Sequence, residues 1–198
     1  RRPNDSAGTL EGVDNIEVGK QAVRLFEAWI EQDLGGASVL AGLYDLNSEF
    51  YATDASSLLI APPFGIGSEL AGNGPNGPSI FPSTALAVRF RATFNCDRGY
   101  VEAAALNARA QTWGDPGGID TRFDDGVLLI GEAGHQFGPA KLSLGAWTYS
   151  KKREDGIATD ALGNPLRRTA WGAYGLLEAR LSGGEDGPHL DGFLRGGA

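Results

Sequence analysis

One stretch constrains the fold more than any other, the alternation in residues 84–94, TALAVRFRATF. Its even positions are all apolar, and two of its odd positions, Arg89 and Arg91, are cationic. Because successive side chains of a strand point to opposite faces, the stretch predicts a strand with one apolar and one cationic face. Its length suits a tilted strand crossing a membrane, which needs roughly 9 to 11 residues, but soluble sheets show the same pattern. The apolar positions are Leu86, Val88, Phe90, Ala92 and Phe94.

The rest of the composition is compatible with a membrane protein only if it crosses with strands. Hydrophobic residues make up 41% of the 198 residues and the mean hydropathy is -0.20, which excludes a disordered chain. No apolar run approaches the ~18 residues that a spanning helix requires. The strands of a barrel need no such apolar run, because only their alternate residues face the lipid. We treat the chain as one structural unit.

Glycine, proline and charge narrow the class further. The 30 glycines and 10 prolines follow no fixed period and favour many short strands and turns over helices. A net charge of -8 argues against a nucleic-acid partner, which needs a basic surface. Cys96 is the single cysteine, so we expect no internal disulfide and no thiolate metal cluster. The start lacks Met and signal-peptide regions, so we expect a leader to be absent or removed, or the sequence to begin within a longer protein.

The first part of the chain allows more than one secondary structure. Residues 1–20 are polar and are expected to form a lead-in, with one barrel domain over residues 21–198. Residues 21–34 have the composition of an amphipathic helix and the alternation of a strand, and the pattern leaves both open. A hairpin over residues 22–44, turning at Gly35 and Gly36, fits best.

The remaining chain predicts a meander of roughly eight antiparallel strands. Alternating runs are expected at residues 84–94, 100–108, 127–137, 140–152, 170–182 and 189–196. Residues 112–125 and 153–167 are expected as polar loops, and residues 53–82, rich in Pro and Gly, as a longer one. Short turns that alternate with long loops are typical of outer-membrane barrels. Ordered loops beyond ~12 to 15 residues usually have a function.

Catalytic signatures are missing from the sequence. It contains no G-x-S-x-G, H-E-x-x-H, P-loop or C-x-x-C motif. Glycines in residues 72–77 match G-x-G-x-x-G, but Pro75 interrupts the motif and no strand-to-helix context surrounds it. His135 and His189 are too isolated to hold a metal ion. We therefore expect no cofactor, no metal and no enzymatic activity.

Two carboxylate pairs could be read as glycosidase catalytic groups. They are Asp45 with Glu49, and Glu27 with Glu31. Residues four apart along a strand are separated by ~13 Å, too far for either glycosidase geometry. We therefore favour the interpretation that they are polar residues solvating one strand face.

The two arginines allow two interpretations, a solvated outer surface or a pore lining. In a pore, guanidinium groups donate hydrogen bonds to sugar hydroxyls or anions. Aromatic rings such as those of Trp29 or Trp147 pack against the C–H faces of sugars. The pattern alone leaves both interpretations open.

Several runs of the sequence resemble those of carbohydrate-selective porins of the OprB family. The resemblance extends from Leu25 to the end and is most specific over residues 47–91. It is carried by RLFEAWIEQ, AGLYDLNSEFYATD, FGIGSELAGNGPNGPSIFPSTALAVRFR, GEAGHQF, KLSLGAWTYSKK and GAYGLLEARL.

The resemblance implies an all-β, antiparallel up-and-down transmembrane β-barrel in the outer membrane of a Gram-negative bacterium. Members are barrels of about sixteen strands that pass glucose and other sugars through an arginine-lined constriction. Eight strands would form a partial barrel, so we expect the amino-terminal to middle part of such a porin. The implied partners are mono- or oligosaccharides and membrane lipid, and the resemblance leaves association with further copies of the chain open. Loop 53–82 would fold inward and narrow the pore.

The matching positions supply the expected pore lining, with the apolar face of residues 84–94 meeting lipid. The main alternative is a soluble all-β carbohydrate-binding module, such as a lectin-like sandwich, and a β-rich glycoside hydrolase ranks below both. The expected lining residues are Arg89, Arg91, Glu27, Trp29, Asp45, Asn47, Glu49 and Trp147.

Overall fold

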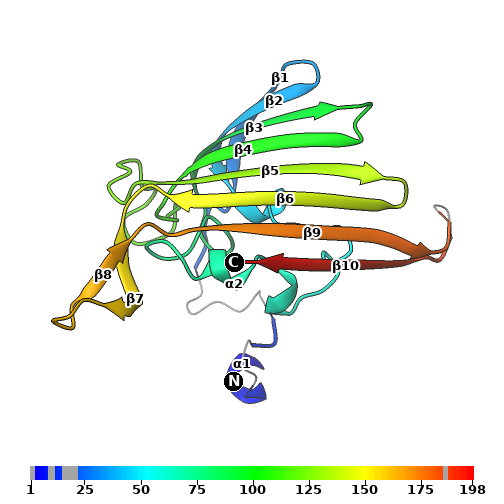
Figure 1. Cartoon of the computed structure of the whole chain (residues 1–198). Coiled ribbons are helices and arrows are strands. Elements are labelled where there is room, and N and C mark those ends of the chain that lie inside the picture. The colour runs from blue at the N-terminus through cyan, green and yellow to red at the C-terminus, as the bar shows by residue number, and fades with distance from the viewer. Residues whose placement is uncertain (1–2, 9–11, 15–21, 185–186) are drawn as a thin grey trace.

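The alternating stretches form one curved antiparallel sheet of eight strands (Figure 1). The computed structural model describes residues 3–8, 12–14, 22–184 and 187–198. Neighbouring strands follow chain order, except that a separate hairpin lies between β6 and β9. The strands are β1 (Ala28–Asp33), β2 (Ala37–Tyr44), β3 (Ala85–Phe94), β4 (Gly99–Asn107), β5 (Val127–Phe137), β6 (Ala140–Tyr149), β9 (Trp171–Ser182) and β10 (Leu190–Gly197). The predicted antiparallel meander is confirmed; the sheet is open, with β1 and β10 at its edges.

Short and long connections alternate along the sheet and gather at opposite ends (Figure 1). Tight turns join β1 to β2, β3 to β4 and β5 to β6. Long segments, residues 45–84 and 108–126, join β2 to β3 and β4 to β5 at the other end. This is the predicted asymmetry of an outer-membrane wall.

The prediction that residues 153–167 form a polar loop is wrong in part. It forms a second, two-stranded sheet of β7 (Arg153–Thr159) and β8 (Pro165–Arg168), which projects at the end of the long connections (Figure 1). The sequence REDGIAT carries few apolar residues and no clear alternation, so it has no pattern of a buried strand face.

Helices are few and short. They are α1 (Pro3–Ala7), α2 (Ser68–Ala71) and the 3-10 turns η1 (Leu46–Ser48) and η2 (Pro62–Phe64). Over the described ranges, none of the helices has the length and apolar character to cross a membrane. Within the predicted lead-in, α1 is a helix, whereas residues 1–2, 9–11 and 15–20 lie outside the described residues. Of the ambiguous stretch 21–34, residues 28–33 form a strand, and Gln21 lies outside the described residues.

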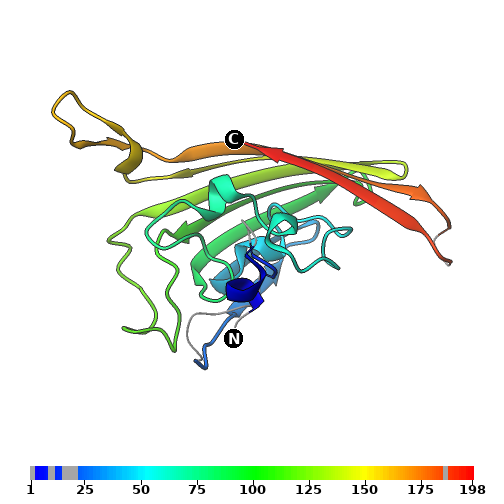
Figure 2. The ribbon, with the colours of Figure 1, turned by 90° about the horizontal axis from the view of Figure 1, so that it is seen from below.

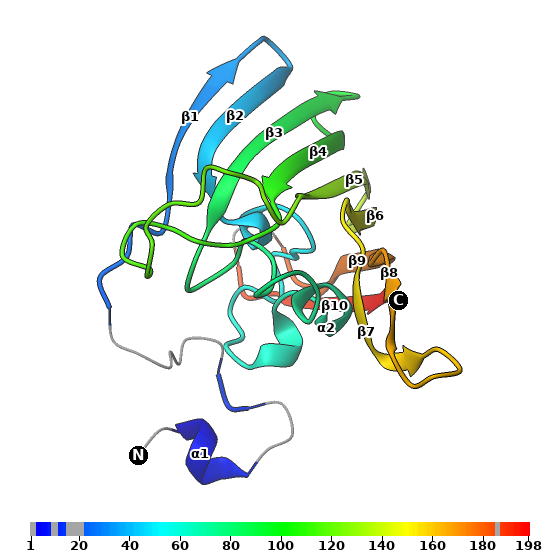
Figure 3. The ribbon, with the colours of Figure 1, turned by 90° about the vertical axis from the view of Figure 1, so that its left-hand side faces the viewer.

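The concave side of the sheet is covered by residues 45–84, which we call the inward segment (Figures 2 and 3). Its apolar side chains pack on the inner face of the sheet near the long connections. Packing begins at Leu46, before the predicted loop boundary at Thr53, because Leu46, Phe50 and Tyr51 are all buried. The resulting core contains Leu40, Tyr44, Leu46, Phe50, Tyr51, Leu70, Ala87, Ala104, Leu106, Ala108, Leu128, Ile130, Trp147, Tyr149, Tyr174 and Leu176.

The outer side of the sheet is apolar and exposed. In β3, Val88, Phe90 and Phe94 are exposed, whereas Ala87 and Arg89 on the opposite face are buried. The strand thus separates its side chains by parity as its alternation predicts.

Candidate functional site: the charged concave face

Strand register places polar and charged side chains of four neighbouring strands, β2 to β5, side by side on the concave face. Toward the long connections the inner rows are mostly apolar and form the core with the inward segment. One row nearer the turns, the inner positions become polar, and they are opposite one another in neighbouring strands: Ser38, Arg91, Glu102 and Glu132. The concave face therefore changes from a packed apolar half to a charged half.

Arg89 lies at the boundary between these halves and is only 3% exposed. Its Nε and Nη2 donate to the two carboxylate oxygens of Glu49, at 2.7 and 2.9 Å. Nη2 also donates to Glu31 at 3.0 Å, and Nη1 donates to the hydroxyl of Ser38 at 2.7 Å. Because a guanidinium has five N–H donors, these contacts use most of its capacity. Arg89 thus ties β1, β2 and the inward segment to β3.

Arg91 is more accessible, with 34% of its side chain exposed. Its Nη1 donates to Glu102 at 2.8 Å, and its guanidinium carbon lies 4.7 Å from the centre of the Tyr100 ring. Within the described part of the chain, its Nε and Nη2 donate no hydrogen bond. Arg91 also lines a cavity of about 560 Å³ together with Glu31, Asp33 and Ser38. It therefore presents hydrogen-bond donors to open space.

Two carboxylates of this face were not among the predicted residues. Glu102 and Glu132 are both 4% exposed. Oε1 of Glu102 has no hydrogen-bond partner among the described residues, whereas Glu132 accepts three hydrogen bonds. The available signal was a Glu at an inward position of an otherwise small or apolar strand, as in YVEAAALN and VLLIGEAG.

Asp45 and Asn47 stabilise a turn at the start of the inward segment, and Glu27, which precedes β1, contacts this turn. Asp45 Oδ1 accepts from the Asn47 N–H at 3.1 Å as the N-cap of η1, and the Asp45 N–H donates to Glu27 at 3.1 Å. Burial, together with the nearby charge of Glu27, raises the pKa of Asp45 to about 6. Asp45 and Asn47 also line a cavity of about 490 Å³ that includes Phe81 and Arg195.

The two predicted tryptophans have different environments. Trp29 in the edge strand β1 is 46% exposed and shares a strand face with Glu31. Trp147 is buried in the core, and its Nε1 has no hydrogen-bond partner among the described residues. Of these two tryptophan rings, that of Trp29 is therefore the one available to a ligand on this face.

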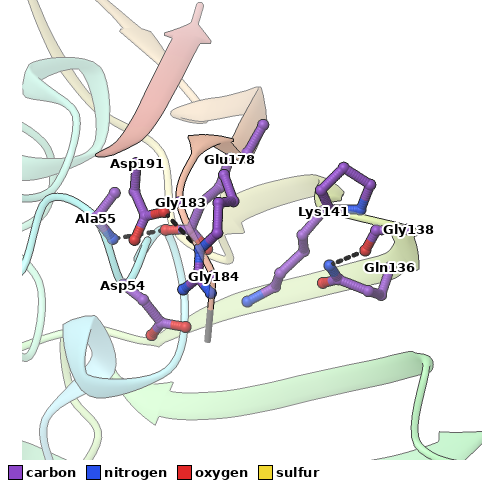
Figure 4. Close-up of a pocket in the computed structure, with 12 residues that line it drawn as sticks. Asp54, Ala55, Gln136, Gly138, Lys141, Glu178, Gly183, Gly184 and Asp191 are labelled. Carbon is purple, nitrogen blue, oxygen red and sulfur yellow. Dashed lines mark hydrogen bonds and ion pairs between the residues drawn. The ribbon is translucent and has the colours of Figure 1, made fainter. Parts of the chain in front are cut away.

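A further cavity, of about 510 Å³, lies nearer the turns (Figure 4). Glu178 accepts a hydrogen bond from the Ala55 N–H at 2.7 Å, and Arg180 pairs with Asp191 at 3.1 Å. The side chain of Lys141 extends toward Asp54 in Figure 4.

The concave face as a whole offers fixed donors and acceptors of both charge signs. Such a surface suits neutral, hydroxyl-rich molecules that both donate and accept hydrogen bonds. No group of His, Cys, Asp and Glu side chains within the described ranges could hold a metal ion.

The comparisons with known proteins agree with this architecture. A family model described as "Carbohydrate-selective porin, OprB family" matches residues 2–197. The fold is similar to the "High pH structure of Pseudomonas putida OprB", with a TM-score of 0.69 and 17% sequence identity. That match covers 91% of this chain and 47% of the other, so the chain spans about half the length of the solved protein. No curated protein matches the chain.

Proposed function

Because the chain belongs to the carbohydrate-selective porins of the OprB family, whose members are outer-membrane proteins of Gram-negative bacteria, we propose that its concave face lines a diffusion path for sugars. The observation that carries the proposal is the partly exposed Arg91, which lines a cavity among acidic and hydroxyl groups. Its free N–H groups are donors for sugar hydroxyls, and Glu31 and Asp33 are acceptors. Trp29, on the same face as Glu31, supplies an exposed aromatic ring.

The predicted lining residues divide among three roles in this proposal, except Trp147, which is buried in the core and has none of them. Arg91 and Trp29 contact the passing sugar. Arg89 and Glu49 hold the inward segment against the wall, since their charged groups pair with each other. The inward segment, which contains the predicted loop 53–82, narrows the path, and Glu27, Asp45 and Asn47 shape the start of that segment.

Passage along such a path is passive, so the chain acts as a channel and not as an enzyme. Contacts must be strong enough to admit a sugar and weak enough to release it. The outward residues such as Val88 and Phe90 contact lipid, which replaces the partner that an exposed apolar surface otherwise needs. Eight strands cover only part of the wall of a water-filled pore, so the path requires further wall beside β1 and β10. Copies of the chain associating within the membrane would be compatible with this arrangement.

Liposome swelling tests the proposal directly. Liposomes that contain the full-length protein are expected to swell in isotonic glucose, and Arg91→Ala is expected to change the swelling rate. Arg98→Ala, in the exposed turn between β3 and β4, is the matched control, and liposomes that contain it should swell at the wild-type rate. Swelling no faster than that of empty liposomes would contradict the proposal. Extraction of the protein into buffer without detergent would instead favour the soluble carbohydrate-binding module.

A further inference from the structure

Glu132 in the middle of β5 is a buried carboxylate held by three hydrogen bonds. The Tyr51 N–H donates to its Oε2 at 3.0 Å, the Tyr174 hydroxyl donates to the same oxygen at 2.6 Å, and the Tyr100 hydroxyl donates to Oε1 at 2.5 Å. Among the described residues, Glu132 forms no ion pair with Lys or Arg. A buried charge without a counter-ion depends on such donors, and hydrogen bonds to a carboxylate are stronger than those between neutral groups. The site is thus built around this one side chain.

Tyr51, in the inward segment, has an unusual backbone conformation at this contact. Its φ of 58° lies in the left-handed region, although it is a bulky residue and buried. Such a conformation is strained for a bulky residue and persists only where surrounding contacts impose it. Here the N–H is held by Glu132, the ring lies 4.0 Å from the ring of Tyr174, and the hydroxyl donates to Glu69 at 2.8 Å. Contacts to β5 and β9 therefore impose the turn at Tyr51.

Two glycines allow the tyrosine hydroxyls to reach Glu132. Gly134 is opposite Tyr100, and Gly145 is opposite both Glu132 and Tyr174 in neighbouring strands. A Cβ at Gly134 would lie 2.3 Å from the Tyr100 ring, and a Cβ at Gly145 would lie 2.2 Å from the Tyr174 ring. Both rings therefore lie close against the strand backbone, in the space that a side chain would fill, with their hydroxyl groups on one carboxylate.

The contact lies where the inward segment crosses the charged half of the concave face. Beyond Tyr51, the segment is held by Glu178 through the Ala55 N–H, and Arg195 donates to the carbonyl of Pro63. Of these wall residues, Glu132 alone is both 4% exposed and bonded to the strained turn. Resting on the proposed function, we infer that Glu132 is the positioning residue that sets how far the inward segment reaches into the pore, and hence the width of the pore.

Two substitutions of equal charge test this role in the full-length protein. Glu132→Gln keeps an oxygen that accepts the Tyr51 N–H and gains N–H donors for the tyrosine hydroxyls. Glu132→Met has similar length and flexibility and removes every acceptor. In planar lipid bilayers with KCl, Glu132→Met is expected to raise the single-channel conductance about twofold, since conduction follows pore diameter, whereas Glu132→Gln stays near the wild-type value. Because both variants lose the same charge, an electrostatic effect alone would change both equally.

Sugar permeation gives a second readout. Liposomes with Glu132→Met should discriminate less between glucose and a trisaccharide than liposomes with Glu132→Gln. If Glu132→Met does not assemble, a double variant, Tyr100→Phe with Tyr174→Phe, replaces it. This double variant deletes only two hydroxyl groups and should also have a higher conductance than the wild type.

Equal conductance of the two Glu132 variants would overturn the inference. So would an unchanged conductance of the double variant where Glu132→Met is not recovered. The conductance measurement needs no sugar. If the wild-type protein conducts ions but its liposomes do not swell in glucose, the proposed function is contradicted, while the role of Glu132 can still be tested by conductance.

Discussion

Arg89 and Glu49 form a two-pronged ion pair across the concave face, with Nε and Nη2 of the arginine 2.7 and 2.9 Å from the two carboxylate oxygens. Arg89 belongs to strand β3 and Glu49 to the inward segment, so the pair joins the sheet to the segment that covers its concave side. Glu31 and Ser38 take up the remaining side of the guanidinium. In the proposed pore, Arg89 therefore holds the shape of the path, whereas Arg91 beside it pairs with Glu102 and is partly exposed.

Arg89→Ala is expected to lower the free energy of unfolding by about 2 to 3 kcal/mol. This loss is smaller than the roughly 3 to 5 kcal/mol typical of broken buried pairs, because Glu31 and Glu49 are partly exposed and regain water. Denaturant unfolding in detergent, followed by tryptophan fluorescence, measures it. Arg98→Ala should change the free energy by less than about 0.5 kcal/mol. Equal unfolding midpoints for the two variants would argue against a holding role for Arg89.

Arg91→Ala is expected to make the pore more selective for cations. The substitution removes a positive charge from a face that keeps Glu31, Glu102 and Asp33. The reversal potential in a KCl gradient measures this change. Arg91→Lys keeps the charge and should keep the wild-type reversal potential, while it loses the planar donor fork. A reversal potential that is the same in wild type and Arg91→Ala would place Arg91 outside the conduction path.

Gly145→Ala is expected to destabilise the protein, and Gly131→Ala is not. A Cβ at position 145 would lie 2.2 Å from a ring carbon of Tyr174, whereas a Cβ at position 131 would meet only the Glu102 carbonyl oxygen at 3.6 Å. Overpacking of this kind costs about 1 to 3 kcal/mol. Denaturant unfolding of both variants in detergent provides the comparison, and equal stability would show that the Tyr174 ring moves aside without cost.

Asp45→Asn is expected to change how stability depends on pH. The pKa of Asp45 is raised to about 6 in the folded protein, above its ordinary value, so the folded state binds the proton more tightly than the unfolded state. The contribution of Asp45 to stability is therefore greatest in acid and is lost as the pH rises through about 6. The stability of Asp45→Asn minus that of the wild type should therefore be larger at about pH 7.5 than at about pH 4.5. Unfolding midpoints of both proteins at the two pH values measure this difference. A wild-type to variant difference independent of pH would contradict this assignment.

Much of the wall was predictable from local patterns. The alternation in residues 84–94 predicted β3 and the faces of its side chains, and similar runs located the other strands of the sheet except β1, whose stretch allowed both a helix and a strand. The hairpin of β7 and β8 was missed because a projecting two-stranded sheet has no buried face to impose a hydrophobic period. The early start of the inward segment was missed because Leu46, Phe50 and Tyr51 follow a strand directly and resemble its continuation.

The candidate site was predictable in its residue types and not in its contacts. Arginine, acidic and aromatic residues on one strand face indicated a polar lining. Their division into buried and partly exposed groups was not visible, since Arg89 and Arg91 carry the same signal in the sequence. Glu132 was overlooked because its partners Tyr51, Tyr100 and Tyr174 come from three separate segments.

Local alternation is enough to assign the apolar faces of the strands, because a period of two is a property of each run on its own. The contacts of Arg89 with Glu49 and Glu31, which lie 40 and 58 residues away along the chain, follow from no such run. Those contacts depend on strand register and on the path of the inward segment across the concave face. Both arise from packing between distant segments, for which no local pattern exists. The alternation of residues 84–94 therefore determined two faces, and packing decided that one of its arginines is buried and the other partly exposed.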